Sequence, residues 1–531
     1  MNAVSRLKSL LYNTICSRAK AAAVMLVAVA CGVSCRTSAQ EVATPVHGVA
    51  PKREVRAVWL TTLNGLDWPT TRATSAATRE RQKQELRDIL DRLRAANINT
   101  VLLQTRVRAT TIYPSAIEPW DVALTGQYGG DPGYDPLAFA IGEAHRRGME
   151  LHAWVVTIPC FKVAVARQMG AAGLLRRHPE LLRRHGDMYY LDPGLPATAD
   201  YLVSVCHEIV ARYDVDGLHF DYIRYPEQAA TFNDAATYKR YGGGRSRAAW
   251  RRDNITAIVR RIHDDVRRTK PWVVVSSSPV GKYADLDRYS SRGWNARDAV
   301  SQDAELWLRE GIHDALFPMM YFDGDNFYPF AADWQEHGCG RCVVPGLGAY
   351  QLDAHERNWP LAAIVRQLRF TRRAGLAGQC YFRSRFLTDD TKGLYAFLRR
   401  DFYAFPALTP ARTWLADSVP AAPEQVRVEV LADGTAALRW HWREHTRYNV
   451  YASRRWPVDT SRPENIVAAA IVEPRYVFNR LYAALSGYNL AVTAMDRYGN
   501  ESEAVQVAAY EGADVPPWRL DIAHPPYLIR P

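Results

Sequence analysis

Short apolar runs alternate with longer amphipathic segments through the middle of the chain. Leu86, Ile89, Leu90 and Leu93 recur at the spacing of one helix face, and the same spacing returns over 137–144. These segments end near Asn or Gly, which commonly terminate helices, and an apolar run of strand length follows each of them. A helix followed by a strand, repeated several times, predicts a sheet of parallel strands covered by helices.

Eight of the apolar runs have the length of a β-strand and are separated by helical segments. They lie at 55–62, 100–106, 150–156, 217–223, 272–279, 315–322, 342–350 and 378–385. Eight parallel strands predict an α/β fold of the (β/α)₈ TIM-barrel type over residues 52–405. An open doubly wound sheet is the alternative, but no G-x-G-x-x-G follows the first strand and no G-x-x-x-x-G-K-[ST] occurs. We expect no cofactor.

A different pattern begins after the Pro- and Ala-rich segment LADSVPAAPEQV. Short runs of alternating polar and apolar residues are then separated by turn signals, which is typical of an all-β unit. Several of these residues resemble the strands of a fibronectin type III sandwich. They are Trp440, Tyr448, Val450 and the stretch 488–502. We therefore predict a small fibronectin III-like sandwich at 422–510, and we assign no function to the Pro-rich tail 511–531.

The beginning of the chain has the composition of an export signal. Four basic residues precede an apolar run, AAAVMLVAVA, which is too short to remain in a bilayer as a helix. These residues are Arg6, Lys8, Arg18 and Lys20. We predict a lipoprotein-type signal peptide at 1–31 with lipidation at Cys31; Cys35 is the second choice, and an ordinary secretory signal is the alternative. The protein is then expected to be exported and lipid-anchored in the bacterial cell envelope, in the outer membrane or periplasm, with no other membrane contact.

Composition excludes some classes of partner. The chain has 531 residues, of which 48% are hydrophobic and 23% charged, which is enough for one large domain and one smaller domain. The formal net charge is +11, but Lys and Arg are spread along the chain, so we expect no nucleic-acid partner. Cys160, Cys206 and Cys380 lie in apolar surroundings, and the CGRC run of Cys339 and Cys342 lacks the second ligand pair of a zinc site. A disulfide or two free thiols are expected at that run.

Polar side chains gather at the carboxyl ends of the predicted strands. The run DGLHFDYIRYP, from Asp216 to Pro226, places several charged groups in an otherwise apolar strand, where each must be desolvated. In a barrel of this type the carboxyl ends of the strands form the active-site rim, and alternate residues of a strand share a face. This predicts that a carboxylate, two imidazoles, a guanidinium, an amide and an indole surround one mouth. They belong to Asp221, His219, His152, Arg106, Gln104 and Trp154.

This set of side chains suits a carbohydrate. Glycoside hydrolysis commonly uses two carboxyl groups, while aromatic faces stack on sugar rings and amide or guanidinium groups bind hydroxyls. Asp221 is predicted as one catalytic carboxylate, and a nearby cation that holds it ionised favours a nucleophile, base or charge stabiliser over an acid. The alternative is a buried salt bridge to Arg224 or to an arginine at a neighbouring strand end. Asp323, just past a predicted strand, is predicted as the second catalytic carboxyl group, which would act as the acid if its loop buries it. Asp192 and Asp121 are loop candidates, although Asp192 begins a DPG sequence that is first of all a turn.

A metal site is the alternative to a glycosidase site at these residues. His152, His219 and Asp221 could bind zinc, since imidazoles and a carboxylate are a common zinc set, and such a site would suit a carbohydrate deacetylase. A His inside a barrel mouth more often orients a carboxylate or contacts a substrate hydroxyl. We therefore predict no metal.

Five stretches of the barrel region resemble a known family. They read EVRAVWLTT, LQTRVRATTIYPSAIEPW, LTGQYGGDPGYDPLAFAIGEAHRRGMELHAW, YLDPGLP and VDGLHFDYIRYP. In this order they resemble glycosyl hydrolase-like family 10, from about residue 52 to residue 400. The resemblance implies a TIM-barrel hydrolase of bacterial cell-surface or environmental glycans, often exported or lipid-anchored, with some members associated with peptidoglycan glycan strands.

The same resemblance marks a set of site residues. Carried over position by position, they are Gln104, Arg106, His152, Trp154, Asp192, Asp221 and Tyr321. To these we add His219, Tyr222 and Arg224 as predicted substrate-binding residues of the Asp221 run. Many members have two adjacent acidic residues where this chain has Asp221-Tyr222, and an Asn-Pro-Tyr-Arg-like run where it has VVTIPC. These departures leave the substrate and the identity of the acid open.

We therefore expect an exported glycoside hydrolase whose partner is a polysaccharide bound at the barrel mouth. A surface lipoprotein that binds glycan without turnover is the first alternative, because the second adjacent acid is missing. A metal-dependent deacetylase is the second alternative.

Overall fold

The computed structural model describes residues 50–508, apart from 228, 288, 290, 292, 482–484 and 486. The predicted signal peptide with Cys31 and Cys35, and the tail 511–531, lie outside the described residues. Within the described part of the chain, no helix is both long and apolar enough to cross a bilayer.

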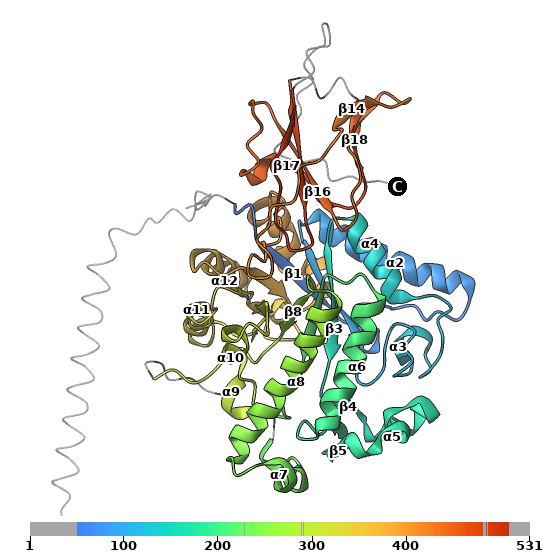
Figure 1. Ribbon diagram of the computed structural model, residues 1–531, viewed down its shortest axis with the longest axis vertical. Coiled ribbons are helices and arrows are strands. Elements are labelled where there is room, and N and C mark those ends of the chain that lie inside the picture. The colour runs from blue at the N-terminus through green and yellow to red at the C-terminus, as the bar shows by residue number, and fades with distance from the viewer. Residues whose placement is uncertain are drawn as a thin grey trace, which may run out of the picture. The chain divides into compact units, whose positions relative to one another are not determined.

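One parallel sheet forms the centre of the N-terminal part (Figure 1). Its strands are β1 (Val55–Leu60), β2 (Thr100–Arg106), β3 (Glu150–Val156), β7 (Gly217–Asp221), β8 (Val274–Ser277), β9 (Ala315–Leu316), β10 (Met319–Met320), β11 (Cys342–Val343), β12 (Gly346–Leu347) and β13 (Gly378–Tyr381). The pairs β9/β10 and β11/β12 are each two halves of one predicted strand. Pro318 and Pro345 separate the halves, because proline has no N–H to donate to the ladder.

The ladder returns to the strand from which it starts. β8 pairs with β9, β9 with β11, β12 with β13, and β13 with β1. The backbone N–H of Met319 also donates to the carbonyl oxygen of Pro279 at 2.9 Å, so β10 continues beside the chain that follows β8. The strands thus occupy the predicted positions, and the prediction of a TIM-type α/β fold is confirmed.

Helices cover the outer face of the sheet, as the amphipathic segments predicted (Figure 1). The longer ones are α2 (Ala76–Ala95), α4 (Pro136–Arg146), α6 (Pro196–Arg212), α8 (Arg247–Thr269), α11 (Tyr328–Glu336) and α12 (Leu361–Arg373). α2 begins with a capping box, in which Ser75 and Thr78 each accept the backbone N–H of the other. Its apolar face then buries Leu86, Leu90 and Leu93 in the core.

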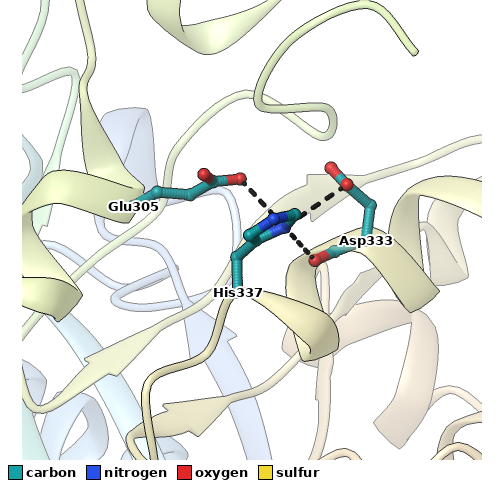
Figure 2. Close-up of side chains that lie close together, drawn as sticks. All are labelled: Glu305, Asp333 and His337. Carbon is teal, nitrogen blue, oxygen red and sulfur yellow. Dashed lines mark hydrogen bonds and ion pairs between the residues drawn. The ribbon is translucent and has the colours of Figure 1, made fainter. Parts of the chain in front are cut away.

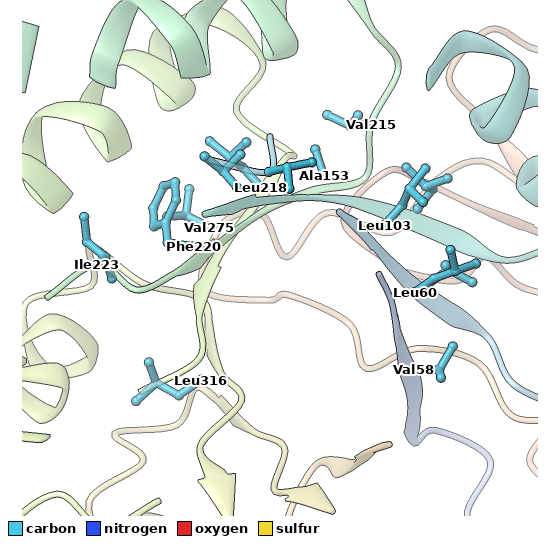
Figure 3. Packing of buried hydrophobic residues seen from close by; sticks show 14 of the residues in the cluster. Val58, Leu60, Leu103, Ala153, Val215, Leu218, Phe220, Ile223, Val275 and Leu316 are labelled. Atoms are coloured by element: carbon cyan, nitrogen blue, oxygen red, sulfur yellow. The ribbon is translucent and has the colours of Figure 1, made fainter. Parts of the chain in front are cut away.

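The barrel strands contribute to two apolar layers because alternate residues face opposite ways. One layer lies between the sheet and the helices, and Figure 3 shows part of it, including Leu60, Leu103, Leu218 and Leu316. The other fills the barrel. Its members include Ala57, Trp59, Leu102, Trp154, Val274, Phe317 and Cys380. Since the interior is packed with side chains, a substrate can meet the barrel only at its ends.

Polar residues at the strand starts hold the barrel floor, the end at which the strands begin. The side chains of Asn99, Asp216 and Asp314 accept backbone N–H groups of β1, β3 and β8 at 2.9, 2.9 and 2.7 Å. Each side chain satisfies a buried backbone donor beside the start of its own strand. The floor consequently buries carboxylates that need counter-charges.

Residues 427–507 form two small antiparallel sheets. One contains β14 (Arg427–Val430), β15 (Thr435–Arg439) and β18 (Arg475–Leu481); the other contains β17 (Ile466–Ile471), β16 (Arg447–Ser453), β19 (Asn489–Met495) and β20 (Val505–Val507). Trp440, Tyr448, Val450 and Phe478 belong to one buried apolar cluster of this part. The change to an all-β unit is confirmed to this extent, and the fibronectin III-like assignment stays a prediction.

Cations from the C-terminal part neutralise two carboxylates of the barrel floor. Asp216 pairs with Arg447 of β16, and Nη2 of Arg497 lies 3.3 Å from Oδ1 of Asp216. Nη2 of Arg412 lies 3.2 Å from Oε1 of Glu150. Burial alone would raise the pKa of both acids, but these charges hold the pKa of Asp216 well below its usual value and lower that of Glu150 to about 2. Residues from late in the sequence therefore stabilise the floor.

Candidate active site

Asp221 is the last residue of β7 and lies at the carboxyl end of the barrel, as predicted. The residue is 6% exposed. Three donors hold its carboxyl group: Nε1 of Trp154 at 3.2 Å, the backbone N–H of Tyr222 at 2.8 Å and the hydroxyl of Ser278 at 3.1 Å. Trp154 is on β3 and Ser278 follows β8, so the pairing of these strands with β7 orients the carboxyl group.

The salt bridge between Asp221 and Arg224 that was considered as the alternative does not form. Among the described residues, Arg224 makes its ion pair with Glu227, with 3.6 Å between Nη2 and Oε1. Burial raises the pKa of Asp221, and the charge of Arg224 and the hydrogen bonds to the carboxyl group offset this only in part. The direction is opposite to the one expected from a neighbouring cation. A raised pKa suits a carboxyl group that delivers a proton.

The raised pKa of Asp221 makes a testable contribution to stability. A carboxyl group whose pKa is higher in the folded than in the unfolded state makes the unfolding free energy fall as pH rises between the two pKa values. We expect the difference in unfolding free energy, wild type minus Asp221→Asn, to decrease from about pH 4 towards neutrality. Denaturant titrations at several pH values measure this difference. A constant or increasing difference would contradict the raised pKa.

Aromatic rings pack together where β10, β12 and β13 end, at the same end of the barrel as Asp221. Tyr321 stacks on Phe382 with ring centroids 5.2 Å apart, and Trp59 and Tyr350 lie at right angles to Tyr321 at 6.4 and 5.7 Å. Burial raises the pKa of the Tyr321 hydroxyl well above its usual value, and the charge of Asp221 raises it further, so this hydroxyl remains a donor. Such rings offer apolar faces to a sugar. Tyr321 lies at the predicted position, whereas no pattern in the sequence indicated that Phe382 and Tyr350 would face it.

Tyr222, directly after Asp221, has a left-handed backbone with φ of 53°. A residue with a large side chain rarely adopts this conformation, which costs roughly 1–3 kcal/mol. The turn aims the Tyr222 N–H at the carboxyl group of Asp221. Backbone strain of this kind concentrates at functional sites, which supports the predicted place of the site.

Arg106 and Gln104 lie at the mouth end of β2, but protein groups occupy their side chains. Arg106 is fully buried and binds Glu118, with Nε 2.8 Å from Oε2 and Nη2 2.6 Å from Oε1. Its Nη1 donates to two backbone carbonyl oxygens at the end of β3. The amide oxygen of Gln104 accepts from the hydroxyl of Thr61 at 2.6 Å. The N–H groups of Arg106 are already bound by Glu118 and by backbone carbonyl oxygens, so the structure does not support the predicted substrate-binding role of Arg106.

The two predicted histidines lie deeper in the barrel than the mouth. The indole N–H of Trp59 donates to Nε2 of His219 at 3.2 Å, so Nδ1 carries the proton and donates to the Ser276 hydroxyl at 3.0 Å. Nε2 of His152 lies 3.2 Å from Oε2 of Glu150 at the floor. These positions correct the prediction that both imidazoles reach the mouth. His219 precedes Asp221, the last residue of β7, by two positions, which is one layer of the barrel interior. Trp154 pairs with His219 and lies in that deeper layer, from which its indole N–H reaches Asp221, and His152 lies deeper still, opposite Gly217.

A cavity of about 30 Å³ lies at the barrel floor. Glu150, His152, Asp314 and Arg412 are among its lining residues. This size suits one or two water molecules and is far too small for a sugar ring. His152 therefore belongs to the packed floor of the barrel and not to a carbohydrate site.

Two loop carboxylates perform local structural tasks. Asp192 accepts from the hydroxyl of Thr237 at 2.6 Å, and Nη2 of Arg183 lies 3.1 Å from the same oxygen. Its other oxygen accepts the N–H of Gly194 at 3.0 Å and closes the DPG turn. Asp121 caps the short helix α3 (Val122–Thr125). The turn interpretation accounts for Asp192 without a substrate.

Asp323 follows β10, and its ion-pair partner is an arginine of a covering helix and not a group that contacts Asp221. Nη2 of Arg366, on α12, lies 3.3 Å from Oδ2 of Asp323. The other oxygen of Asp323 is buried and accepts no hydrogen bond within the described residues. No hydrogen bond links Asp323 to Asp221 in the described part of the chain. The role of Asp323 as the second catalytic carboxyl group stays a prediction.

A further cluster, which sequence reasoning did not find, lies between α10 (Ala304–Arg309) and α11. Figure 2 shows His337 between Glu305 and Asp333, with Nδ1 at 3.5 and 3.4 Å from their carboxylate oxygens. These are metal-ligand types, but Nδ1 already donates to the backbone carbonyl oxygen of Asp333 at 2.9 Å. We interpret His337 as a cap at the C-terminus of α11, because its ring N–H donates to a backbone carbonyl oxygen of the last turn. Burial and the charge of Asp333 raise the pKa of Glu305 to about 7.

This chain is similar to one protein family and to several proteins that are described as glycosyl hydrolases. The Glycosyl hydrolase-like 10 domain matches residues 54–339. The glycosyl hydrolase YngK of Bacillus subtilis (strain 168) is 31% identical over 484 residues, which are 85% of this chain and 92% of YngK. The glycosyl hydrolase DigH of Escherichia coli (strain K12) is 34% identical over 343 residues, which are 58% of this chain and 77% of DigH. Among solved structures, the PgaB (BpsB) glycoside hydrolase domain from Bordetella bronchiseptica aligns with a TM-score of 0.43 and 15% identity, over 66% of this chain and 99% of that domain.

Proposed function

Because this chain belongs to the Glycosyl hydrolase-like 10 family, we propose that it is a glycoside hydrolase that cleaves O-glycosidic bonds of a bacterial cell-surface or environmental polysaccharide. Peptidoglycan glycan strands are one such substrate. The bond is cut by carboxyl acid–base catalysis at the barrel mouth, and no cofactor takes part.

The observation that carries this proposal is the environment of Asp221. Its carboxyl group is buried at the end of β7 with a raised pKa, beside the aromatic rings of the mouth. The acid delivers its proton to the glycosidic oxygen as the bond from that oxygen to the sugar carbon breaks, and a second carboxyl group directs water to the carbon or bonds to it first. Trp154 and Ser278 are placed to donate to the carboxylate that remains. We propose Asp323 as the second group.

A second candidate function is glycan binding without turnover. One observation favours it: among the described residues, no second carboxyl group shares a hydrogen bond or ion pair with the groups that hold Asp221. The metal-dependent deacetylase has weaker support, since both ring nitrogens of His219 have partners inside the barrel.

We also propose where the protein acts. The composition of the first residues supports export and a lipid anchor at Cys31 in the bacterial cell envelope. Sheets of three and four antiparallel strands around one core support a fibronectin III-like C-terminal unit.

Product analysis on purified glycans tests the proposed hydrolysis. We expect new reducing ends from at least one member of a panel that contains peptide-free peptidoglycan strands, chitin oligosaccharides and polyuronides. Heat-denatured protein is the control. Binding without products would favour the second candidate, and released acetate without new reducing ends would favour the deacetylase.

A further inference from the structure

We propose that Arg224 is a specificity-determining residue that binds a carboxylate carried by the substrate. The inference rests on the proposed function, because it assigns a substrate class, anionic glycans, to the same mouth.

The guanidinium of Arg224 is buried without a full set of partners. The residue is 4% exposed, and its Nε and Nη1 are buried and donate no hydrogen bond within the described residues. Its ion pair with Glu227 is long, at 3.6 Å, and the Glu227 side chain is 62% exposed. Buried donors are almost always hydrogen-bonded, and a buried charge is costly unless it is paired. An acceptor from a ligand would satisfy both requirements.

Two aromatic rings hold this guanidinium in place. Its Cζ lies 4.6 Å from the ring centroid of Tyr222 and 4.8 Å from that of Trp294. Cation–π contacts orient the guanidinium plane without using its N–H groups as hydrogen-bond donors. Tyr222 is 36% exposed and Trp294 is 41% exposed. Both rings can therefore also contact a sugar that approaches Arg224.

The position of Arg224 links it to the proposed chemistry. It follows Asp221 by three residues, and its charge is the largest of the influences that lower the pKa of that acid. When Asp221 carries its proton it supplies no negative charge. The guanidinium then has only the exposed Glu227 as a counter-charge among the described residues.

A carboxylate fits this site better than a hydroxyl group does. A hydroxyl is uncharged and has a single acceptor oxygen, whereas a carboxylate offers two acceptor oxygens and also balances the charge. The carboxylate can sit on the sugar ring itself or on an acid attached through an ether oxygen. Both sources share this chemistry, so the experiment contains an arm for each.

The test uses the full-length wild-type protein and substrate pairs that differ only in charge. Peptide-free peptidoglycan strands carry ether-linked carboxylates, and a polyuronide carries ring carboxylates; each is compared with its carboxyl-reduced form. We expect kcat/KM to fall roughly 10- to 100-fold on reduction in one arm. The substrate pair that shows the fall identifies whether the recognised carboxylate is ether-linked or belongs to the sugar ring. Equal rates within both pairs would overturn the inference and leave the proposed hydrolysis intact.

Binding measurements separate the two proposals if no substrate is cut. Titration calorimetry with the same pairs would then show whether the anionic form binds more tightly. A preference for the anionic form would support the role of Arg224 while the proposed hydrolysis fails. Equal binding of both forms, or no binding of any, would overturn the inference.

Variants assign the preference to Arg224. Arg224→Gln is expected to bring the ratio between the anionic and reduced forms close to one, and Arg224→Lys to restore part of it. The control is Arg240→Gln: Arg240 is exposed and its Cζ lies 5.2 Å from the ring of Tyr241, so a similar Arg–Tyr contact is changed outside the mouth. The control should keep the preference. A folded Arg224→Gln variant that also keeps it would overturn the inference, and if this variant does not fold, the wild-type pairs decide.

Discussion

Replacement of Asp221 by Asn is expected to lower kcat by roughly 10²- to 10⁴-fold while the affinity for glycan changes by no more than a few-fold. The Asn side chain keeps the size of Asp, and its oxygen can accept from Ser278 and from the Tyr222 N–H. It has no proton to give to a glycosidic oxygen. Turnover and the dissociation constant, measured on one glycan, separate these two effects.

Two further carboxylates sharpen this experiment. Asp325→Asn changes an exposed acid in the turn after β10 and should leave both turnover and affinity unchanged. Asp323→Asn tests the proposed second group: a loss as large as that of Asp221→Asn would support it, and unchanged turnover would remove it. Unchanged turnover of Asp221→Asn itself would contradict the mechanism.

Replacement of Arg106 by Met is expected to lower the unfolding free energy by about 3–5 kcal/mol. Without the guanidinium, Glu118 would remain buried with the Tyr201 hydroxyl, at 2.6 Å, as its other side-chain partner among the described residues. Denaturant titration measures the loss. The exposed Arg176→Met is the control and should change stability by less than about 0.5 kcal/mol.

The same variants distinguish a structural from a binding role for Arg106. Replacing Arg106 and Glu118 together by apolar residues should recover much of the lost stability, because no charge is then left unpaired. A loss under about 1 kcal/mol for Arg106→Met, accompanied by a raised KM, would instead support the substrate-binding role that the sequence predicted.

The barrel could be predicted because the spacing of apolar residues along the chain shows directly which faces of the helices and strands are buried. Leu86, Leu90 and Leu93 face the core as their spacing indicates, and the strands lie within or close to the predicted ranges. The interruptions at Pro318 and Pro345 were visible as residues but not recognised as breaks. Their effect depends on which neighbouring strand needs the missing N–H, and that is a property of the closed sheet.

The site could be predicted only in part. Parity along a strand indicates which residues face the barrel axis, so Trp154 and Asp221 were placed correctly relative to the sheet. The alternation of residues along a strand does not show at which layer of the barrel interior a side chain lies. The register sets Trp154 opposite His219, one layer below Asp221, and only the paired strands reveal it. The contact between Trp294 and Arg224 is made by two loops, and the sequence of a loop has no periodic pattern from which such a contact could be predicted.

The ribosome synthesises the carboxylates of the barrel floor long before the arginines that pair with them. Glu150 and Asp216 emerge in the first half of translation, whereas Arg412, Arg447 and Arg497 emerge near its end. A nascent barrel would have to bury these acids before the three arginines exist, with His145 as the early partner of Asp216, which is unfavourable. The barrel is therefore expected to close only when the last sheet has been synthesised.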